Sequence, residues 1–305
     1  MHFELADADG VRKPTYRTEK PYATEFEIEE KDGVRRTNYV LASEEVTIRE
    51  IPPGDDFTLG QNGFCVIQHA TSLDVDQVIS DPELVEDAYL QQLANILTQR
   101  SPEYTRVEPF EFVVRKRDER FRSNRTARVT HEQPAYTTHS DYSPRGALLQ
   151  LHHSFPGQRA YFENCDFDMI NVWRVLTGPN DDWPLTLCDF NSIDHGNDRI
   201  ATDRMHKDHI GENELLFPNT KHKWYYIPGQ LPDQLLVFRN TDASGLRSKA
   251  FHASFFSPQS RGPPRQSCEA RFVAFRERPL RAVRPVGLAK HNGNRDTGRR
   301  TLAWP

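Results

Sequence analysis

The sequence predicts a mainly β protein with peripheral helices, its strands closed into a jelly roll or barrel. From residue 110 onward, short runs of β-branched and aromatic residues are separated by Pro, Gly and Asn. Little helical periodicity lies between these runs, which favours antiparallel pairing, because parallel strands need crossovers of about a dozen residues or more. The predicted strands are residues 110–115, 146–152, 169–176, 185–190, 223–227, 234–239, 251–256 and 270–275.

One long helix is predicted after residue 81. Asp81 suits an N-cap, Pro82 suits the first helical position, and the acidic residues that follow favour the positive end of the helix dipole. The apolar residues then recur at steps of three and four, which predicts a face that packs on a sheet. They are Leu84, Val85, Ala88, Leu93, Ile96 and Leu97.

The two ends of the chain differ from its centre in composition. Residues 1–50 are polar and charged, and we expect an N-terminal arm that either wraps the core or is partly disordered, with a short strand at 46–51. Residues 261–300 hold eleven basic and three acidic side chains, and residues 278–305 form a basic tail. Because few aromatic residues interleave with these charges, a solvated tail is favoured over nucleic-acid binding. The charged arm could mediate a homodimer.

Several protein classes are excluded or disfavoured. The mean hydropathy of −0.74 comes with no apolar run near the roughly 20 residues of a membrane helix. The N-terminus is acidic where a signal peptide is basic, so we expect a soluble, cytoplasmic protein. The four cysteines form no CxxC pair and are expected to be free, buried thiols. Glycine-rich nucleotide loops and the GxSxG nucleophile motif are absent.

The twelve histidines raise the question of a metal site. Two imidazoles and one carboxylate can hold iron(II) and leave coordination positions open. A His-x-Asp pair on a strand supplies two of these ligands, because residues i and i+2 point to the same side. His139-Ser140-Asp141 has this spacing, and so does His206-Lys207-Asp208. The second pair lies in the polar stretch 202–209, which has no strand character and is expected to be a solvated loop.

A third ligand is offered by His252, in a predicted strand 113 residues after His139. Arg265 and Ser267 follow, and an arginine fork beside a hydroxyl is suited to a buried carboxylate. The order of these three elements is more specific than any one of them. The alternative is that His252 is a core histidine with satisfied hydrogen bonds and Arg265 a surface charge.

This ordered set resembles the iron(II)- and 2-oxoglutarate-dependent dioxygenases, and within them the fungal hydroxylase/desaturase group that includes gibberellin desaturase and relatives of the cephamycin methoxylation protein. The resemblance covers residues 60–277. It extends through the motifs Gly63-Phe64, His69, Asn171-Val172-Trp173-Arg174, Trp183-Pro184-Leu185, Cys188-Asp189, Trp224-Tyr225-Tyr226 and residues 265–271.

The resemblance implies a double-stranded β-helix in residues 60–277, within a single catalytic domain spanning residues 1–305. It implies that His139, Asp141 and His252 bind Fe(2+), that Arg265 and Ser267 bind the C5 carboxylate of the cosubstrate 2-oxoglutarate, and that O2 is consumed. The reaction would be hydroxylation, desaturation or oxidative cyclisation at an unactivated C–H bond of a small molecule of secondary metabolism. Arg271 remains an alternative anchor for the cosubstrate.

Four residues are candidates for the substrate pocket. Asn171 and Trp173 share one face of a predicted strand and Arg174 lies on the other, so the three cannot all point inward. Arg174 would pair with a substrate carboxylate or form a structural ion pair. Tyr136 precedes the iron motif and would form a pocket wall or pack in the core.

Two other functions compete with the oxygenase. One is a methyltransferase-associated protein, which the missing glycine-rich turn for a nucleotide cofactor argues against. The other is a non-catalytic β-barrel that binds small molecules, which the intact set of proposed ligands argues against.

Overall fold

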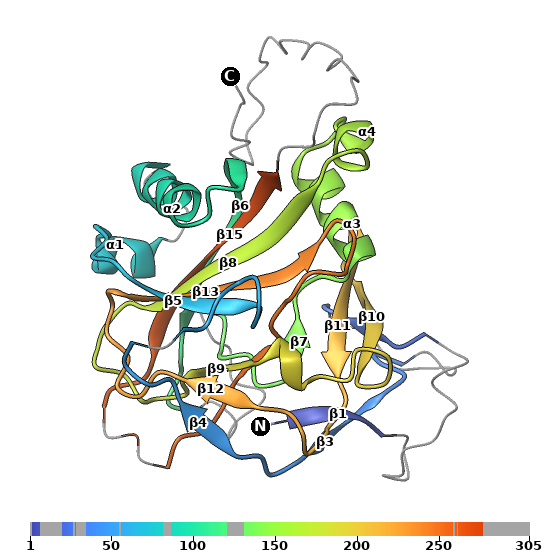
Figure 1. Ribbon diagram of the computed structural model, residues 1–305. Helices are drawn as coiled ribbons and strands as arrows, with labels where there is room; N and C mark the ends of the chain where they lie inside the picture. The colour runs from blue at the N-terminus through green and yellow to red at the C-terminus, as the bar shows by residue number, and fades with distance from the viewer. Residues whose placement is uncertain are drawn as a thin grey trace.

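The described residues form two large β-sheets with helices on their outer sides, and a small two-stranded sheet of β1 and β3 (Figure 1). The computed structural model describes residues 2–6, 20–26, 28, 35–54, 56–81, 87–120, 131–258, 260 and 262–276. The predicted basic tail, 278–305, lies outside these residues. The strands are β1 (His2–Ala6), β2 (Tyr22–Thr24), β3 (Val40–Ser43), β4 (Ile48–Glu50), β5 (Phe64–Gln68), β6 (Tyr104–Lys116), β7 (His139–Ser140), β8 (Phe167–Val175), β9 (Leu185–Cys188), β10 (Arg199–Met205), β11 (Ile210–Leu216), β12 (Trp224–Tyr226), β13 (Gln234–Asp242), β14 (His252–Ser254) and β15 (Gln266–Arg276). The helices are α1 (Val75–Ser80), α2 (Asp87–Arg100), α3 (Pro144–Ser154) and α4 (Arg159–Phe162), with a short 3-10 turn at Phe190–Ser192.

Strand order follows the closure expected of a jelly roll. One sheet has five strands in the order β5-β13-β8-β15-β6, all antiparallel. The other has eight in the order β2-β10-β11-β7-β14-β9-β12-β4, antiparallel except at its two edge pairs. Apart from the β10–β11 hairpin, most neighbouring strands of the two large sheets are far apart in sequence, and the prediction of a mainly β, double-stranded β-helix fold is confirmed.

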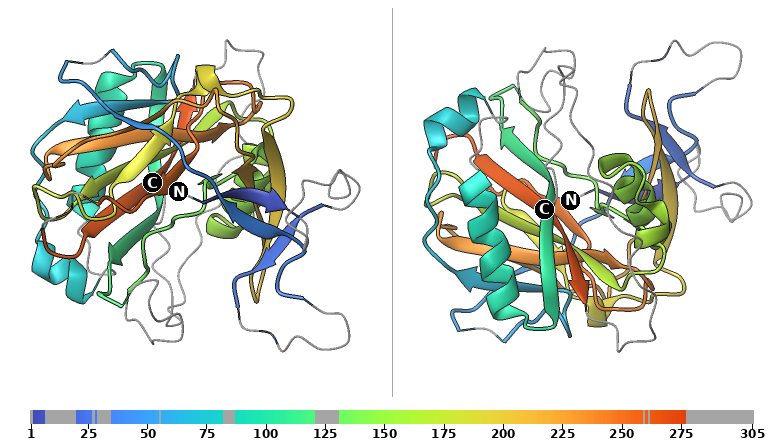
Figure 2. Two further views of the ribbon diagram at one scale, coloured as in Figure 1. Left: turned by 90° about the horizontal axis from the view of Figure 1, so that it is seen from below. Right: turned by 90° about the horizontal axis from the view of Figure 1, so that it is seen from above.

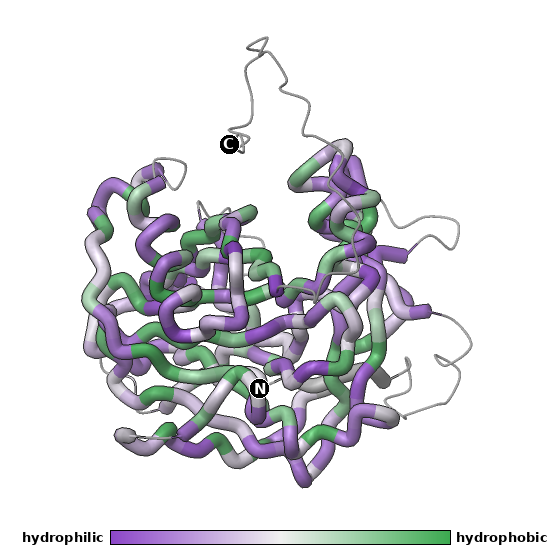
Figure 3. The backbone as a smooth tube through the Cα atoms, turned by 45° about the horizontal axis from the view of Figure 1, so that its top comes forward, coloured by the Kyte–Doolittle hydropathy of each residue, from purple (hydrophilic) through white to green (hydrophobic). Residues whose placement is uncertain are grey.

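Alternation along the strands divides the side chains of the five-stranded sheet between two cores. On β8, Ile170 and Val172 face outward and pack against α2, whereas Trp173 and Val175 face the other sheet. Because successive residues of a strand point to opposite faces, one strand supplies both cores. Figure 3 shows the resulting mixture of green, hydrophobic stretches and purple, hydrophilic ones along the chain.

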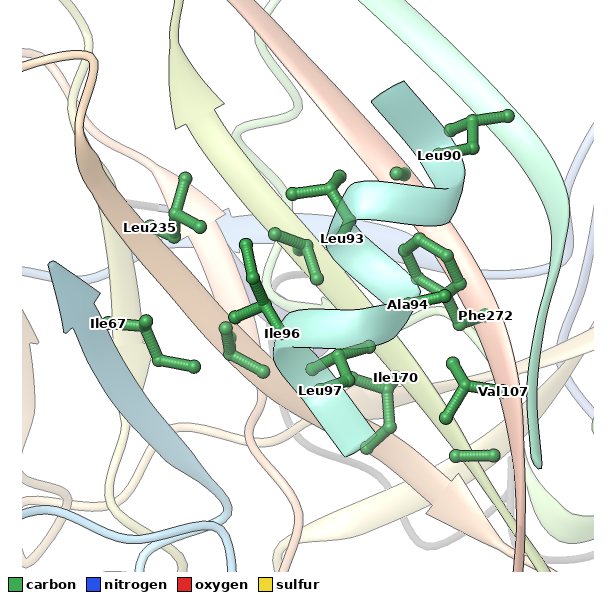
Figure 4. Close-up of a cluster of buried hydrophobic side chains, with 14 of the residues drawn as sticks. Ile67, Leu90, Leu93, Ala94, Ile96, Leu97, Val107, Ile170, Leu235 and Phe272 are labelled. Atoms are coloured by element: carbon green, nitrogen blue, oxygen red, sulfur yellow. The ribbon is translucent and has the colours of Figure 1, made fainter. Parts of the chain in front are cut away.

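The predicted long helix is present as α2, which lies across the outer face of the five-stranded sheet (Figure 2). Its buried residues include Leu93, Ile96 and Leu97, which contact apolar side chains of the sheet (Figure 4). Asp81, predicted as the N-cap, instead ends the preceding helix α1, where its N–H donates to the Gln77 carbonyl. Residues 82–86 lie outside the described part of the chain.

The predicted strand 146–152 is wrong, because these residues form the middle of α3. The Ser143 hydroxyl caps the helix by accepting from the Gly146 N–H, and Pro144 occupies the first turn. Ala147, Leu151 and Phe155 recur at four-residue steps and are buried with β8 and β15 side chains. The apolar run was therefore one face of a helix rather than a strand core.

The polar stretch 202–209 is only partly the loop that was predicted. Residues 199–205 form β10, which pairs with β11 along its whole length, and only residues 206–209 form the connecting turn. The N-terminal region also adds strands to the sheets, since β2 pairs with β10 and β4 with β12. Among the described residues, no helix combines the length and apolarity needed to cross a membrane.

Candidate metal centre and cosubstrate site

The two proposed histidine ligands face each other across paired strands. His139 of β7 and His252 of β14 are direct partners in the antiparallel register, and their ring centroids are 4.4 Å apart. Residues opposite each other in such a pair project to the same face of the sheet. Pairing of two very short strands thus brings together residues that are 113 positions apart.

Asp141 completes the group immediately after β7. Its Oδ1 lies 3.2 Å from Nε2 of His139 and 3.5 Å from Nε2 of His252. One donor atom from each of the three residues lies within 4.8 Å of the others. The side chains of Asp141 and His252 are nearly inaccessible to solvent, and that of His139 is 17% exposed.

Hydrogen bonds hold the proposed ligands in orientations suited to a metal. Nδ1 of His139 lies 2.7 Å from the Thr137 carbonyl oxygen, so Nδ1 carries the proton and donates to that oxygen. The unprotonated Nε2 is then available as a metal ligand. The second oxygen of Asp141, Oδ2, accepts from Nδ2 of Asn171 at 2.8 Å and lies 3.2 Å from Nε of Arg271. Only Oδ1 of the carboxylate therefore faces the two histidines.

The electrostatics favour the metal-binding protonation states of Asp141 and His252. Burial alone would raise the pKa of Asp141, but the Arg271 guanidinium and the two neighbouring histidines hold that pKa well below its ordinary value. Burial and the neighbouring His139 lower the pKa of His252. A carboxylate and a neutral imidazole are the forms that bind a metal, so the residues present fit an Fe(II) ion.

The Arg265 guanidinium is buried and forms no ion pair with a carboxylate among the described residues, which is costly for a cation. The Asp182 carboxylate instead accepts from the Arg265 main-chain N–H at 2.7 Å. The Arg265 Nη1 donates to the Trp183 carbonyl and to Oγ of Ser254, the latter at 2.7 Å, while its Nε has no hydrogen-bond partner in the part of the chain that the structure describes. Burial, with Arg115 nearby, lowers the pKa of Arg265 to about 9. This is the environment expected of a guanidinium that binds an anionic ligand.

Ser267 and Trp173 extend the same site. Oγ of Ser267 is buried with no partner in the described structure, and the Arg265 guanidinium carbon lies 5.4 Å from the centre of the Trp173 ring. Along β15, alternation puts Ser267, Glu269 and Arg271 on the inner face. One row of side chains thus leads from Arg265 to Asp141, whose partner Arg271 closes the row.

Three of the four pocket candidates can be placed relative to this row. Asn171 contacts Asp141, and Trp173 lies beside Arg265. Arg174 points to the opposite face of β8, where Nη1 donates to Oγ1 of Thr71. Its side chain therefore does not meet the other candidates, as the alternation of the strand required. Tyr136 is half-buried in the segment that leads into β7.

Sequence reasoning missed the residues that position the ligands. Arg271 was considered only as a cosubstrate anchor, yet it contacts the carboxylates of Asp141, Glu111 and Glu269. Asn240 accepts from the Asp141 N–H at 3.0 Å through its side chain, and its carbonyl accepts from Ser140 at 2.7 Å. The six-residue spacing from Arg265 to Arg271 was a signal for Arg271. Asn240 acts through a tertiary contact, and Thr137 acts through its main-chain carbonyl, so the residue type at either position gave no signal.

Residues 11–275 match a family model described as "YDMC: Oxidoreductase/YMDC permease-like domain". The chain is 30% identical over 240 residues to the Fe(II)/2-oxoglutarate-dependent dioxygenase nvfI of Aspergillus novofumigatus, covering 73% of this chain and 80% of that protein. It is 23% identical to the Gibberellin cluster GA4 desaturase of Gibberella fujikuroi, covering 76% of this chain and 87% of the relative.

The solved structure of the iron and alpha-ketoglutarate-dependent endoperoxidase NvfI superimposes with a TM-score of 0.73. The alignment covers 85% of this chain and 95% of that one at 24% identity, which establishes the common fold. The family match over most of the sequence adds the activity class. The chain belongs to this oxidoreductase family and, within it, to the iron(II)- and 2-oxoglutarate-dependent dioxygenases.

Proposed function

We propose that His139, Asp141 and His252 bind Fe(II), and that Arg265 and Ser267 bind the C5 carboxylate of 2-oxoglutarate. The observation that carries this proposal is the convergence of three donor atoms from residues 139, 141 and 252 within 4.8 Å. The buried guanidinium of Arg265 and the Ser267 hydroxyl, which has no partner among the described residues, support the assignment of the 2-oxoglutarate site. Family membership supports iron, 2-oxoglutarate and O2 as the reaction components.

Bound iron would supply the oxidising power, by reductive activation of O2 coupled to decarboxylation of the keto acid, that breaks an unactivated C–H bond. The chain's own contribution is positioning. Arg271 and Asn171 hold Oδ2 of Asp141, which leaves one oxygen for the metal and other positions open. Arg265 and Ser267 fix the far end of the cosubstrate, and the surrounding apolar residues limit access of water.

The substrate is a small molecule of secondary metabolism, and the reaction is hydroxylation, desaturation or oxidative cyclisation. Curated relatives are named hydroxylase/desaturase and dioxygenase, so one fold serves several outcomes. We propose that Asn171, Trp173 and Tyr136 line the substrate side, and that Arg174 has a structural role. We also propose a single catalytic domain over residues 1–305, a cytoplasmic location, no nucleic-acid partner and a homodimer formed through the N-terminal arm.

Anaerobic titration tests the site. The full-length protein with Fe(II) and 2-oxoglutarate should develop the weak visible charge-transfer band of a keto acid chelated to iron. His252→Ala should abolish the band, whereas His206→Ala, in the other His-x-Asp motif, should leave it. Loss of the band in His206→Ala with retention in His252→Ala would show that the ligand assignment is wrong. A wild-type protein without the band would exclude the oxygenase site and favour a non-catalytic binding protein.

A further inference from the structure

A second group of metal-ligating side chains lies outside the iron centre. His153 is in the last turn of α3, and Asp208 and His209 are in the turn between β10 and β11. One donor atom from each of these residues lies within 4.8 Å of the others. The group is half-exposed, in contrast to the buried iron centre. Figure 2 shows α3 beside this hairpin, with α2 on the other side of the molecule.

Ring contacts hold the imidazoles of this group in place. The His209 ring stacks on His153 at a centroid distance of 4.1 Å and on His206 at 4.2 Å, so it lies between the two. Nδ1 of His209 is 2.8 Å from Oδ1 of Asp208. A metal that displaces the proton between these two atoms would be bound by both Nδ1 of His209 and the Asp208 carboxylate. The turn itself is closed by the His206 N–H, which donates to the His209 carbonyl at 2.9 Å.

We propose that His153, Asp208 and His209 form a second metal site, for a borderline divalent ion of the Zn²⁺ class. Imidazole nitrogen combined with one carboxylate oxygen suits Zn²⁺, Ni²⁺ or Cu²⁺ rather than Ca²⁺ or Mg²⁺. Three protein ligands with a water in the fourth position form a tetrahedral Zn²⁺ centre. Ligand distances of about 2.0–2.2 Å require the exposed Asp208 side chain to move and the stacked rings of His153 and His209 to turn so that their nitrogens converge.

The location of the site gives it a structural consequence. α3 begins directly after the proposed ligand segment, with Ser143 as its cap, and β11 pairs with β7, which carries His139. A metal joining the end of α3 to the β10–β11 turn therefore links two elements that flank the iron centre. An ion that binds only the folded chain would increase the free energy of unfolding, and the increase would grow with the Zn²⁺ concentration relative to the dissociation constant.

Calorimetric titration of the full-length chain with Zn²⁺ tests the site. A His139→Ala/His252→Ala background removes two iron ligands, so Zn²⁺ uptake reports on the second group. This background should bind one equivalent of Zn²⁺, and adding His153→Ala or His209→Ala should remove that equivalent. His69→Ala serves as the control. His69 follows β5 and is far in sequence from the proposed zinc ligands, so this substitution should leave Zn²⁺ binding intact.

Hydrogen exchange provides a second measurement. Zn²⁺ should protect amides at the end of α3 and in residues 206–209, and should raise the melting temperature of the background protein. If His209→Ala does not fold, Asp208→Asn changes only an exposed side chain and should still weaken binding. No Zn²⁺ uptake by the background protein would overturn the proposal, and so would uptake that survives both the His153 and Asp208 substitutions.

Discussion

Gly146 of α3 lies directly against the backbone of Glu212 in β11. A Cβ at position 146 would be 1.8 Å from the Glu212 carbonyl oxygen, a distance that no side chain tolerates. The hydrogen bonds from Ser143 and Arg145 to the Glu212 carboxylate fix the same contact from the side. Helix and strand can approach this closely only because residue 146 has no side chain.

Gly146→Ala should therefore destabilise the fold even though alanine is the better helix former. The helix must move away from β11, and we expect the free energy of unfolding to fall by about 1–3 kcal/mol, as for other overpacked sites. Denaturant unfolding measures this loss. Gly196→Ala is the control, because a Cβ there meets its nearest atom at 3.6 Å. Equal stability of the two variants would contradict the close contact.

Arg271→Ala should weaken metal binding without removing a ligand. Asp141 would lose the guanidinium beside Oδ2 and keep only the Asn171 hydrogen bond, so its carboxylate would be less well ionised and oriented. Loss of such an outer partner reduces metal affinity by about 10–100-fold. Anaerobic titration with Fe(II) provides the measurement, and Arg159→Ala, which removes an exposed charge, provides the control. Unchanged affinity in Arg271→Ala would refute the positioning role.

Arg265→Ala should weaken 2-oxoglutarate binding by about 2–5 kcal/mol, because it would leave a buried carboxylate without its charge partner. Arg265→Lys should restore only part of the affinity, since an ammonium lacks the planar fork of a guanidinium.

Arg174→Ala tests the assignment of faces on β8. It should lower stability through loss of the Thr71 contact while the dissociation constant of 2-oxoglutarate stays the same. A larger effect of Arg174→Ala on cosubstrate binding would mean that the faces are wrongly assigned.

Stability should depend on pH through His222. This imidazole is buried, and its Nε2 lies 2.9 Å from Oδ2 of Asp198. Burial lowers its pKa below the ordinary value of 6.5, although Asp198 opposes the shift. As the pH falls below 6.5, the unfolded chain takes up a proton that the folded chain resists, so the free energy of unfolding decreases.

Replacing this residue should reduce that dependence. His222→Gln removes the titrating group, and the decrease in the free energy of unfolding from about pH 7.5 to about pH 5.5 should be smaller than in the wild type. Urea unfolding of the metal-free protein at several pH values measures the difference. If the wild type and His222→Gln had the same pH dependence, the pKa of His222 would be the same in the folded and the unfolded chain.

The class of fold and the His139/Asp141 pair could be predicted from local pattern, whereas His252 was proposed from the order of motifs along the chain. His-x-Asp needs only two neighbouring positions, and alternation along β8 correctly separated Asn171 and Trp173 from Arg174. The order of strands was beyond reach, because the pairing of β7 with β14 depends on closure of the whole sheet.

Two local misreadings have clear physical causes. Gly146–Leu151 is apolar enough for a buried strand, and short apolar runs do not distinguish strand from helix by periodicity alone. The Ser143-Pro144 start signal favoured the helix that the structure contains. Most side chains of β10 are polar, so its sequence shows no apolar strand pattern. Main-chain hydrogen bonds, rather than apolar burial, hold this strand to β11.

The opposition of His139 and His252 also constrains when the metal can act during folding. The two strands that present these residues are two and three residues long, and they pair across 113 positions of sequence. Contacts between residues so far apart in sequence form late in folding, because the conformational entropy lost on closing the loop is not offset until the strands pair. A growing chain has no complete ligand set until His252 has been synthesised and β14 has inserted between β7 and β9. A metal bound by the proposed ligands would therefore stabilise the assembled barrel against unfolding, but it could not nucleate folding.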